Sequence, residues 1–356
     1  MSSFFKKLAG SRTRLGVDIG TASIKIAEVY HGDNGPTLKN YGVLESLDYL
    51  ERGNAAFQTS TLHADEQMIA RNLRVLMRES GIEPGEAVAS LPSFSAFTTL
   101  IEVPVLTDEE LAGSMVLHAK QYIPLPITET TLDWTKVGER IDEDGNKKLQ
   151  IFLVSIPNNA VQSVKKIFEL AKLPLVGLEI EGAGLARSLT PDKKEPTLIV
   201  DIGSRSTTLI VAQAGLLRFV GQTDFAGGSL TQVLVNSLRL SAKRAEEIKR
   251  RRGLTGMGGE QQLSTLLEPI LDVIINESIR AKNNYETTYK SKVSSVVFSG
   301  GGANLPGLMN YAGEVIGLPC SKAQPLRSLK YPPEMDSFIG ELGPLLSVAI
   351  GLAMKL

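Results

Sequence analysis

The sequence has little of what a disulfide-linked or membrane-spanning protein needs. Its 356 residues include one cysteine, Cys320, so no intramolecular disulfide is possible, which suits a reducing compartment. No run reaches the roughly 18 uninterrupted apolar residues that a spanning helix requires. The three histidines, His31, His63 and His118, stand apart, and no spacing of Cys and His is typical of a zinc site.

An excess of charge of one sign is also absent. There are 38 Lys and Arg against 39 Asp and Glu, which argues against attraction of the whole surface to nucleic acid or anionic lipid. With 42% hydrophobic and 22% charged residues the composition is that of a globular protein, and the length predicts about two domains.

The first ten residues, MSSFFKKLAG, carry Phe4, Phe5, Lys6 and Lys7. They lack the apolar core and the cleavage site of a signal peptide. Two interpretations stay open for this tail: a frayed end, or a weak foothold on a membrane or a partner.

What the sequence does contain is a repeated turn. Residues 15–23 read LGVDIGTAS and residues 198–206 read LIVDIGSRS, so that Asp18 and Asp201 lie about one domain length apart. Both copies continue with apolar residues, which predicts two β-hairpins with the Gly-Thr or Gly-Ser segment at the bend. Self-similarity over this distance predicts two related domains.

An aspartate in an apolar strand is costly unless it is paired, hydrogen-bonded or held near a metal. Two such hairpins that face each other can grip one polyphosphate. Their amides and hydroxyls would hold phosphate oxygens, and the two carboxylates would hold Mg²⁺ through its water shell. One copy alone predicts an ordinary turn, whereas the pair predicts phosphate binding.

The segment between the repeats predicts an inserted α+β unit. Thr107 and Glu110 have the spacing of a capping box, and Leu111, Met115 and Tyr122 fall on one face of the helix that follows.

Two strands are expected around the turn at residues 144–145. Asn158 is then expected to cap a helix with an apolar stripe formed by Val161, Val164, Phe168 and Ala171.

Three features follow the second hairpin. Gly227 and Gly228 precede a helix expected at Ser229, a geometry that can present free amides to phosphate. The basic run 249–252 is either a solvated helix end or, beside Glu246, part of a nucleoside pocket.

Residues 260–289 predict a long amphipathic helix that Pro269 bends or breaks, with Leu263, Leu267, Ile270 and Ile274 on one side. A strand then runs into the triple glycine 300–302, which permits close approach of the backbone to a flat ligand.

The order of these motifs resembles the actin-like ATPase superfamily: DIGTAS, DIGSRST, AEEIKRRRG, FSGGGANLPGL and LLSVAIGLA. Three stretches are most similar to the PilM family of type IV pilus assembly proteins: FFKK, VPVLTDEELAGSMVLHAKQYIPLPITETTLDW and LVSIPNNAVQSVKKIFELAKLPLVGLEIE. The resemblance implies an α/β fold, namely an actin-like (ribonuclease H-like) two-domain ATPase with an inserted α+β subdomain of FtsA/PilM type.

The resemblance also implies four parts. The first actin-like subdomain is expected at residues 13–86, 177–196 and 335–356, with the inserted subdomain at 87–176. The second actin-like subdomain is expected at 197–226 and 291–334, with its helical subdomain at 227–290.

In such a protein ATP with Mg²⁺ lies between the two halves, and the matching positions imply the site. The first phosphate loop would supply Asp18, Gly20, Thr21, Ser23 and Lys25, and the second Asp201, Gly203, Ser204 and Ser206. Gly227 and Gly228 would lie near phosphate, Glu246, Lys249 and Arg250 would meet the nucleoside, and Gly300, Gly301, Gly302 and Asn304 would cover the adenosine. Asp18 and Asp201 would hold Mg²⁺ through water, and Glu181 matches the region that orients the attacking water in faster relatives.

The implied role is a cytoplasmic scaffold in pilus biogenesis and twitching motility, with slow or no hydrolysis. It would bind the cytoplasmic N-terminal peptide of a PilN-type inner-membrane protein, in a groove between the inserted lobe and its neighbour. It would thus reach the inner membrane only through a partner. Other pilus assembly proteins and a further copy of the chain are possible partners, and nucleic acid is not.

Two other functions remain open. An FtsA-type protein would polymerise, although the sequence ends at Leu356 without the amphipathic tail usual in that group. A small-molecule kinase would need a sugar-binding constellation with a general base, and none is evident. A chaperone is less favoured, because no substrate-binding domain follows the ATPase core.

Overall fold

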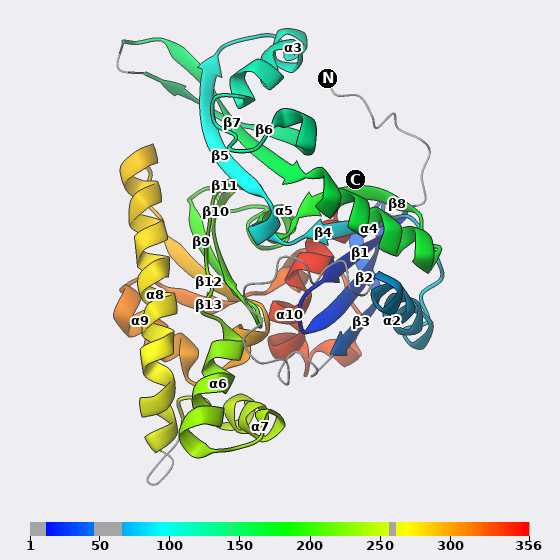
Figure 1. The fold of residues 1–356 in the computed structure, drawn as a ribbon, viewed down its shortest axis with the longest axis vertical. Helices are drawn as coiled ribbons and strands as arrows, with labels where there is room; N and C mark the ends of the chain where they lie inside the picture. Colours follow the sequence, from blue (N-terminus) through cyan, green and yellow to red (C-terminus); the bar gives the residue numbers. More distant parts are fainter. Residues whose placement is uncertain (1–11, 46–65, 143, 256–260, 356) are drawn as a thin grey trace.

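The computed structural model describes residues 12–45, 66–142, 144–255 and 261–355. The expected foothold of Phe4, Phe5, Lys6 and Lys7 lies outside the described residues. Figure 1 shows two sheets side by side, with a smaller lobe at one end of the long axis and helices around them. Across the described ranges, no helix is both long enough and apolar enough to cross a membrane.

The first sheet has five strands in the order β3-β2-β1-β4-β8. They are β1 (Thr13–Ile19), β2 (Ser23–Gly32), β3 (Gly35–Glu45), β4 (Ala87–Leu91) and β8 (Leu175–Ile180). The first three are antiparallel neighbours, whereas β4 and β8 run parallel to β1.

The second sheet repeats this plan in the order β11-β10-β9-β12-β13. Its strands are β9 (Thr197–Ile202), β10 (Thr207–Gln213), β11 (Leu216–Thr223), β12 (Ser295–Ser299) and β13 (Cys320–Lys322). Three antiparallel strands are again followed by two parallel ones. The two predicted hairpins, β1–β2 and β9–β10, are confirmed, and the repeat in sequence corresponds to a repeat in strand order.

Helices α5 (Glu181–Leu189) and α10 (Ile339–Ala353) pack against each other and against the first sheet. The contact is so close that backbone meets backbone. A Cβ at Gly351 would overlap the carbonyl of Gly184 on α5, and one at Gly16 on β1 would overlap the carbonyl of Ala349. The small residues of LLSVAIGLA are therefore required where α10 crosses β1 and α5.

The lobe has a three-stranded antiparallel sheet, β5 (Phe97–Pro104), β7 (Lys147–Pro157) and β6 (Thr130–Ile141), with helix α3 (Asp108–Ala119) against it. The predicted capping box is confirmed, since Thr107 accepts from the Glu110 amide and Glu110 from the Thr107 amide. Tyr122 is wrongly placed: the helix ends before it, and its side chain is exposed while Ala119 is buried.

Strand β4 limits the lobe. A subdomain that begins at residue 87 would include it, yet β4 hydrogen-bonds to β1 and β8 in the first sheet. The lobe's own sheet begins only at Phe97.

Helix α4 (Asn158–Ala171) leads back from the lobe and packs on α2 (Glu66–Glu79). Its predicted stripe, Val161, Val164, Phe168 and Ala171, is buried in the core of the first sheet. The prediction that Asn158 caps the helix is wrong. It is the first helical residue, and its side chain instead accepts from the Thr131 hydroxyl through Oδ1 and donates to the Thr128 carbonyl through Nδ2.

The remaining long helices surround the second sheet: α6 (Gly227–Leu238), α7 (Ala242–Arg252), α8 (Gln261–Tyr289) and α9 (Leu308–Ile316). Short 3₁₀ turns are η2 (Ser93–Ser95), η3 (Ile127–Glu129), η5 (Gly301–Asn304), η6 (Pro325–Ser328) and η7 (Pro333–Met335). Helix α8 continues through Pro269, so the proline does not break it. Pro269 is exposed, where a carbonyl that lacks its helical donor remains accessible to water.

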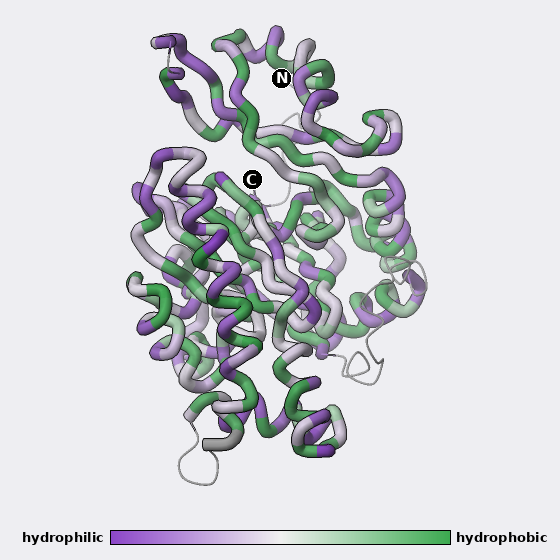
Figure 2. Tube along the Cα trace, turned by 60° about the vertical axis from the view of Figure 1, so that its left-hand side comes forward, coloured by the Kyte–Doolittle hydropathy of each residue, from purple (hydrophilic) through white to green (hydrophobic). Residues whose placement is uncertain are grey.

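Two main cores result. One joins the first sheet to α2, α4 and α5, and the other joins the second sheet to α6, α8 and α9. In Figure 2, hydrophobic residues gather along the central strands, and hydrophilic ones dominate the tip of the lobe's hairpin.

The contact between α10 and α5 yields a test with a matched control. We expect Gly351→Ala to lower the free energy of unfolding by about 3 kcal/mol, because its methyl would overlap a backbone carbonyl that cannot rotate away. Gly313→Ala, within α9, meets no atom within 4 Å and should raise it by about 0.5–1 kcal/mol. Urea unfolding measures both, and equal effects would contradict the proposed packing.

Candidate functional site

The two hairpin turns have the same local geometry. In the first, the Gly20 amide donates to the Ser23 carbonyl at 3.0 Å, and in the second the Gly203 amide donates to the Ser206 carbonyl at 3.1 Å. Four hydroxyls on these turns make no hydrogen bond to any described residue: Thr21, Ser23, Ser204 and Ser206. They are therefore free to bind an incoming ligand.

Asp18, at the end of β1, is almost fully buried, and both of its oxygens are used. Oδ1 accepts from the Ser90 hydroxyl at 2.9 Å, and Oδ2 accepts from Lys25 Nζ at 3.0 Å. Ser90 lies in β4, directly beside the end of β1. One hydroxyl and one ammonium thus compensate for the burial of this carboxylate.

Asp201 occupies the equivalent place at the end of β9, beside Ser299 of the parallel strand β12. Burial raises the pKa of Asp201 to about 6; the positive charge of Lys25 opposes this, the charge of Asp18 adds to it, and a hydrogen bond from Ser299 lowers it. Each aspartate therefore has a serine beside it on the neighbouring parallel strand, but the Ser299 hydroxyl also donates to the Pro344 carbonyl at 3.2 Å, so its one hydrogen is shared.

Glu181, the first residue of α5, belongs to the same cluster. Its Oε2 accepts from the Ser93 amide at 3.2 Å. Burial raises the pKa of Glu181 to about 8, and the charges of Asp18 and Asp201 add to this shift. At neutral pH the carboxyl is therefore largely protonated unless a cation joins it.

Lys25 is the shared counter-charge. Burial opposes its charge, but Asp18, Asp201 and Glu181 outweigh this and raise its pKa. Lys25 stands opposite Asp18 in the first hairpin, whereas Thr208 stands opposite Asp201 in the second. The structure thus brings residues from both repeats and from α5 together around one lysine.

Helix α6 starts at Gly227, two residues earlier than expected, and packs directly against the second turn. The Gly227 amide donates to the Gly203 carbonyl at 3.0 Å, and the Gly228 amide donates to the Ser204 carbonyl at 2.8 Å. The prediction of free amides here is wrong. A Cβ on either glycine would come within 3.0 Å of those carbonyls, so these glycines serve close packing of helix on turn.

Glu246 and Lys249 form a buried ion pair on α7, with Nζ and Oε2 2.7 Å apart. Lys249 also donates to the Gly227 carbonyl and to the Thr231 hydroxyl, each at 2.8 Å. Burial alone would raise the pKa of Glu246, but Lys249, Thr231 and Arg250 together lower it. The pair therefore ties α7 to the start of α6 and, through it, to the second turn.

The triple glycine lies against the end of β9. Gly300 has φ 76°, and a Cβ on it or on Gly302 would strike Ile202, whereas Gly301 is exposed. The side chain of Asn304 bonds within the protein: its Nδ2 donates to the Glu341 carbonyl at 2.9 Å, and its Oδ1 accepts from Lys322 at 3.3 Å.

Three residues of the site were missed from the sequence. Ser90 and Ser299 end equivalent strands, and an alignment of VAS with VFS as part of the repeat would have found them. Glu45, at the end of β3, forms an ion pair with Arg250 at 3.0 Å. No local signal identifies Glu45, because its partner lies in the other half of the chain.

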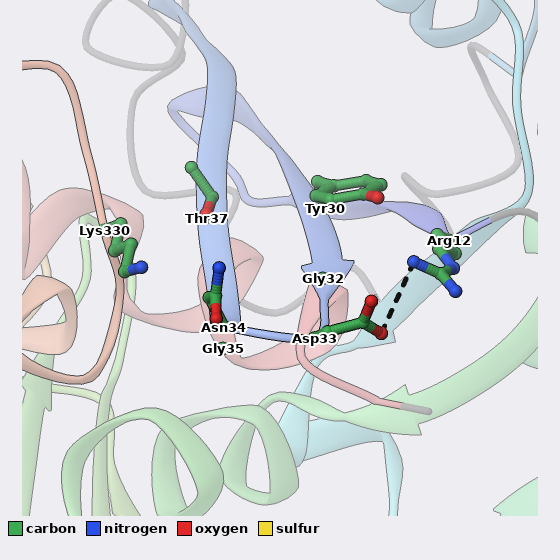
Figure 3. Close-up of a pocket in the computed structure, with 8 residues that line it drawn as sticks. All are labelled: Arg12, Tyr30, Gly32, Asp33, Asn34, Gly35, Thr37 and Lys330. Atoms are coloured by element: carbon green, nitrogen blue, oxygen red, sulfur yellow. Dashed lines mark ion pairs between the residues drawn. The ribbon is translucent and has the colours of Figure 1, made fainter.

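Two cavities are lined by none of the clustered carboxylates. One of about 320 Å³ lies at the turn between β2 and β3, with Arg12 and Lys330 on opposite sides and Asp33 paired to Arg12 (Figure 3). Asp18 stands opposite Lys25, and the seven residue steps from Lys25 to Gly32, at about 3.3 Å each, separate this turn from the carboxylates by roughly 23 Å. Another of about 520 Å³ runs along α7 and is lined by Arg250 among others.

Comparison with known proteins covers nearly the whole chain. The family described as "Type IV pilus assembly protein PilM" matches residues 16–356. A curated relative, the cell division protein FtsA of Enterococcus hirae, is 22% identical over 355 aligned positions that cover 85% of this chain and 76% of that protein.

Among solved structures, a PilM–PilN type IV pilus biogenesis complex matches with a TM-score of 0.81 and 23% identity, over 96% of this chain and 98% of that one. MreB5 of Spiroplasma citri bound to AMPPNP matches with a TM-score of 0.54 and 13% identity, over 96% and 94% of the two chains. The fold is thus the α/β fold of the actin-like ATPases, as predicted.

The shared lysine provides the test of the cluster. We expect Lys25→Met to lower the free energy of unfolding at pH 7 by about 3 kcal/mol, because breaking a buried ion pair leaves Asp18 without its counter-charge. Lys165→Met, at an exposed position of helix α4, should change it by less than about 0.5 kcal/mol. Denaturant unfolding measures both, and a Lys25 variant as stable as the control would refute the electrostatic account.

Proposed function

The chain belongs to the PilM family of type IV pilus assembly proteins, and from this premise we propose that it is an ATP-binding, actin-like scaffold of the pilus assembly machinery. One observation carries the proposal. Asp18 and Asp201 are the residues before the last of equivalent strands in two repeated sheets, and both act electrostatically on Lys25 and Glu181. A ligand held there is held by both halves.

The nucleotide would be bound mainly by the two turns. Four hydroxyls that make no hydrogen bond within the described residues would bind phosphate: Thr21, Ser23, Ser204 and Ser206. The cluster of Glu246, Lys249 and Arg250 would support the nucleoside, with the exposed Gly301 at the adenosine. Gly20, Gly203, Gly227, Gly228, Gly300 and Gly302 would shape the backbone around it.

The carboxylates fit a hydrated cation. Among the described residues, no group of three or more His, Cys, Asp or Glu is placed to hold a metal directly. Magnesium retains several waters and is often bound through one or two carboxylates and substrate phosphates, which matches Asp18 and Asp201. A bound cation would supply the positive charge that these two groups and Glu181 share only with Lys25.

Hydrolysis would be slow or absent. Glu181 is the residue that would orient an attacking water, yet its Oε2 already accepts a hydrogen bond from the Ser93 amide at 3.2 Å. Contacts to phosphate alone do not give fast hydrolysis without a well-placed water. Nucleotide occupancy would then act through the relative placement of the two halves.

The proposed partner is the cytoplasmic N-terminal peptide of a PilN-type protein, because the PilM structure similar to this chain was solved as a PilM–PilN complex. This peptide would lie between the lobe and the first sheet and would bring the chain to the inner membrane. The four-part division of the chain is proposed with it, with the lobe's own sheet starting at Phe97.

Nucleotide titration tests the site. We expect the double variant Asp18→Asn with Asp201→Asn to bind ATP with Mg²⁺ at least about tenfold more weakly, a loss of about 1.4 kcal/mol, because both groups that would hold the hydrated cation are neutral. Asp33→Asn, at an exposed position, should bind like wild type. Removal of Mg²⁺ should weaken wild type and leave the double variant unchanged. Undiminished affinity in the double variant would reject the site.

Peptide titration tests the partner. A synthetic peptide with the cytoplasmic N-terminal sequence of the PilN-type protein should bind one to one by calorimetry, and a scrambled peptide should not. Its affinity with and without ATP and Mg²⁺ should differ by about fivefold or more, the usual scale of coupling between two sites. Equal affinities with and without nucleotide would contradict the proposal that nucleotide controls partner binding, but not the proposal that the chain is a scaffold.

A further inference from the structure

Arg250 joins the two halves of the molecule through one guanidinium group. Its Nε donates to Glu246 Oε1 at 2.7 Å, within the same helix α7. Its Nη1 lies 3.1 and 3.0 Å from the two carboxylate oxygens of Glu45, at the end of β3 in the first sheet. Two carboxylates from opposite halves therefore share one cation.

Both ends of this link are tied to the candidate nucleotide site. On the second half, Glu246 is buried and fixed by Lys249, which bonds the first residue of α6. On the first half, Glu45 stands opposite Ser23 in the pairing of β2 with β3. The link thus runs from the helix beside the second turn to the strand position beside the first turn.

A second contact crosses between the halves. The Arg205 guanidinium, on the second turn, lies over the ring of Phe94 at 5.4 Å from its centroid. Phe94 follows Ser93, whose amide holds Glu181. One contact between the halves thus lies at or beside each turn. Both contacts restrain the same relative placement of the two halves.

We propose that Glu45 is a positioning residue of the nucleotide site: through Arg250 it holds the two halves closed and slows release of the nucleotide. This rests on the proposed function, because the ligand is the nucleotide that the two turns would hold. A ligand that contacts both halves favours the arrangement in which they are close, and any contact that stabilises the same arrangement retains the ligand longer.

The expected effect is modest and sensitive to salt. The side chains of Glu45 and Arg250 are 39% and 52% exposed. Exposed ion pairs of this kind change an equilibrium by roughly twofold to fivefold. Salt screens such pairs, since the Debye length falls from about 10 Å at 0.1 M to about 3 Å at 1 M.

The primary experiment measures the rate at which a fluorescent ATP analogue with Mg²⁺ leaves the protein. At low salt, Glu45→Gln should release it about twofold to fivefold faster than wild type, and Glu45→Lys faster still, because a second cation then faces Arg250. Glu45→Gln is the reference for the effect of salt. Added salt should speed release from wild type more than from Glu45→Gln, because it screens an attraction. It should slow release from Glu45→Lys compared with Glu45→Gln, because it screens a repulsion. A group with a merely structural role would not invert the salt effect.

Glu83→Gln serves as the matched control, because it removes the same charge from an exposed glutamate of the first half that forms no ion pair with a described residue. It should release the analogue at the wild-type rate. Equal changes in Glu83→Gln and Glu45→Gln would overturn the proposal, since any loss of negative charge from the first half would then explain both.

A second readout needs no nucleotide. In a Cys320→Ser background, labels at Arg71→Cys on α2 and Lys243→Cys on α7 report the distance between the halves. Adding Glu45→Gln should broaden this distance distribution or shift it to longer values. An unchanged distribution together with an unchanged release rate would overturn the role of Glu45. If the double variant Asp18→Asn with Asp201→Asn binds ATP as tightly as wild type, the nucleotide site is wrong. A longer distance between the two labels in Glu45→Gln would still support closure of the halves by Glu45.

Discussion

The structure depends on the burial of carboxylates at the place where two sheets meet. Asp18 is buried and Asp201 is half-buried, each one residue before the end of a central strand, where a carboxylate without partners would be costly. Serine hydroxyls from the neighbouring parallel strands and the single ammonium of Lys25 make the arrangement tolerable. The raised pKa values of Asp201 and Glu181 show that this compensation is incomplete. The cation and the anionic ligand proposed for this site would complete the balance of charge.

Close packing holds this arrangement in place. Helix α10 meets β1 and α5 through Gly16, Gly184 and Gly351, where no side chain intervenes. On the other half, α6 meets the second turn through glycines whose amides bond its carbonyls. The amides at the start of α6 are therefore bonded to the second turn and are not free, which differs from the usual way in which helix amides bind phosphate.

Local patterns predicted the local structure well. The two hairpins, the capping box at Thr107 and the apolar stripe of α4 follow from spacing within one segment. The failures have a common origin in contacts between distant segments. Asn158 bonds a neighbouring strand instead of capping its helix, and the Gly227 amide bonds a turn instead of staying free. Ser90 lies in a strand 72 positions from Asp18, and Glu45 lies 205 positions from Arg250. Such pairs are set by the sheet order, which periodicity in one segment does not encode.

The repeated strand order gives the molecule a frame in which each half mirrors the plan of the other. A frame of that kind, if its chemistry were equally duplicated, would accept an elongated ligand in either direction. The position opposite the aspartate breaks this indifference, since it is a lysine in one hairpin and a threonine in the other. Because these two residues differ, the two halves of the proposed site are not equivalent, and an elongated ligand would bind in one orientation.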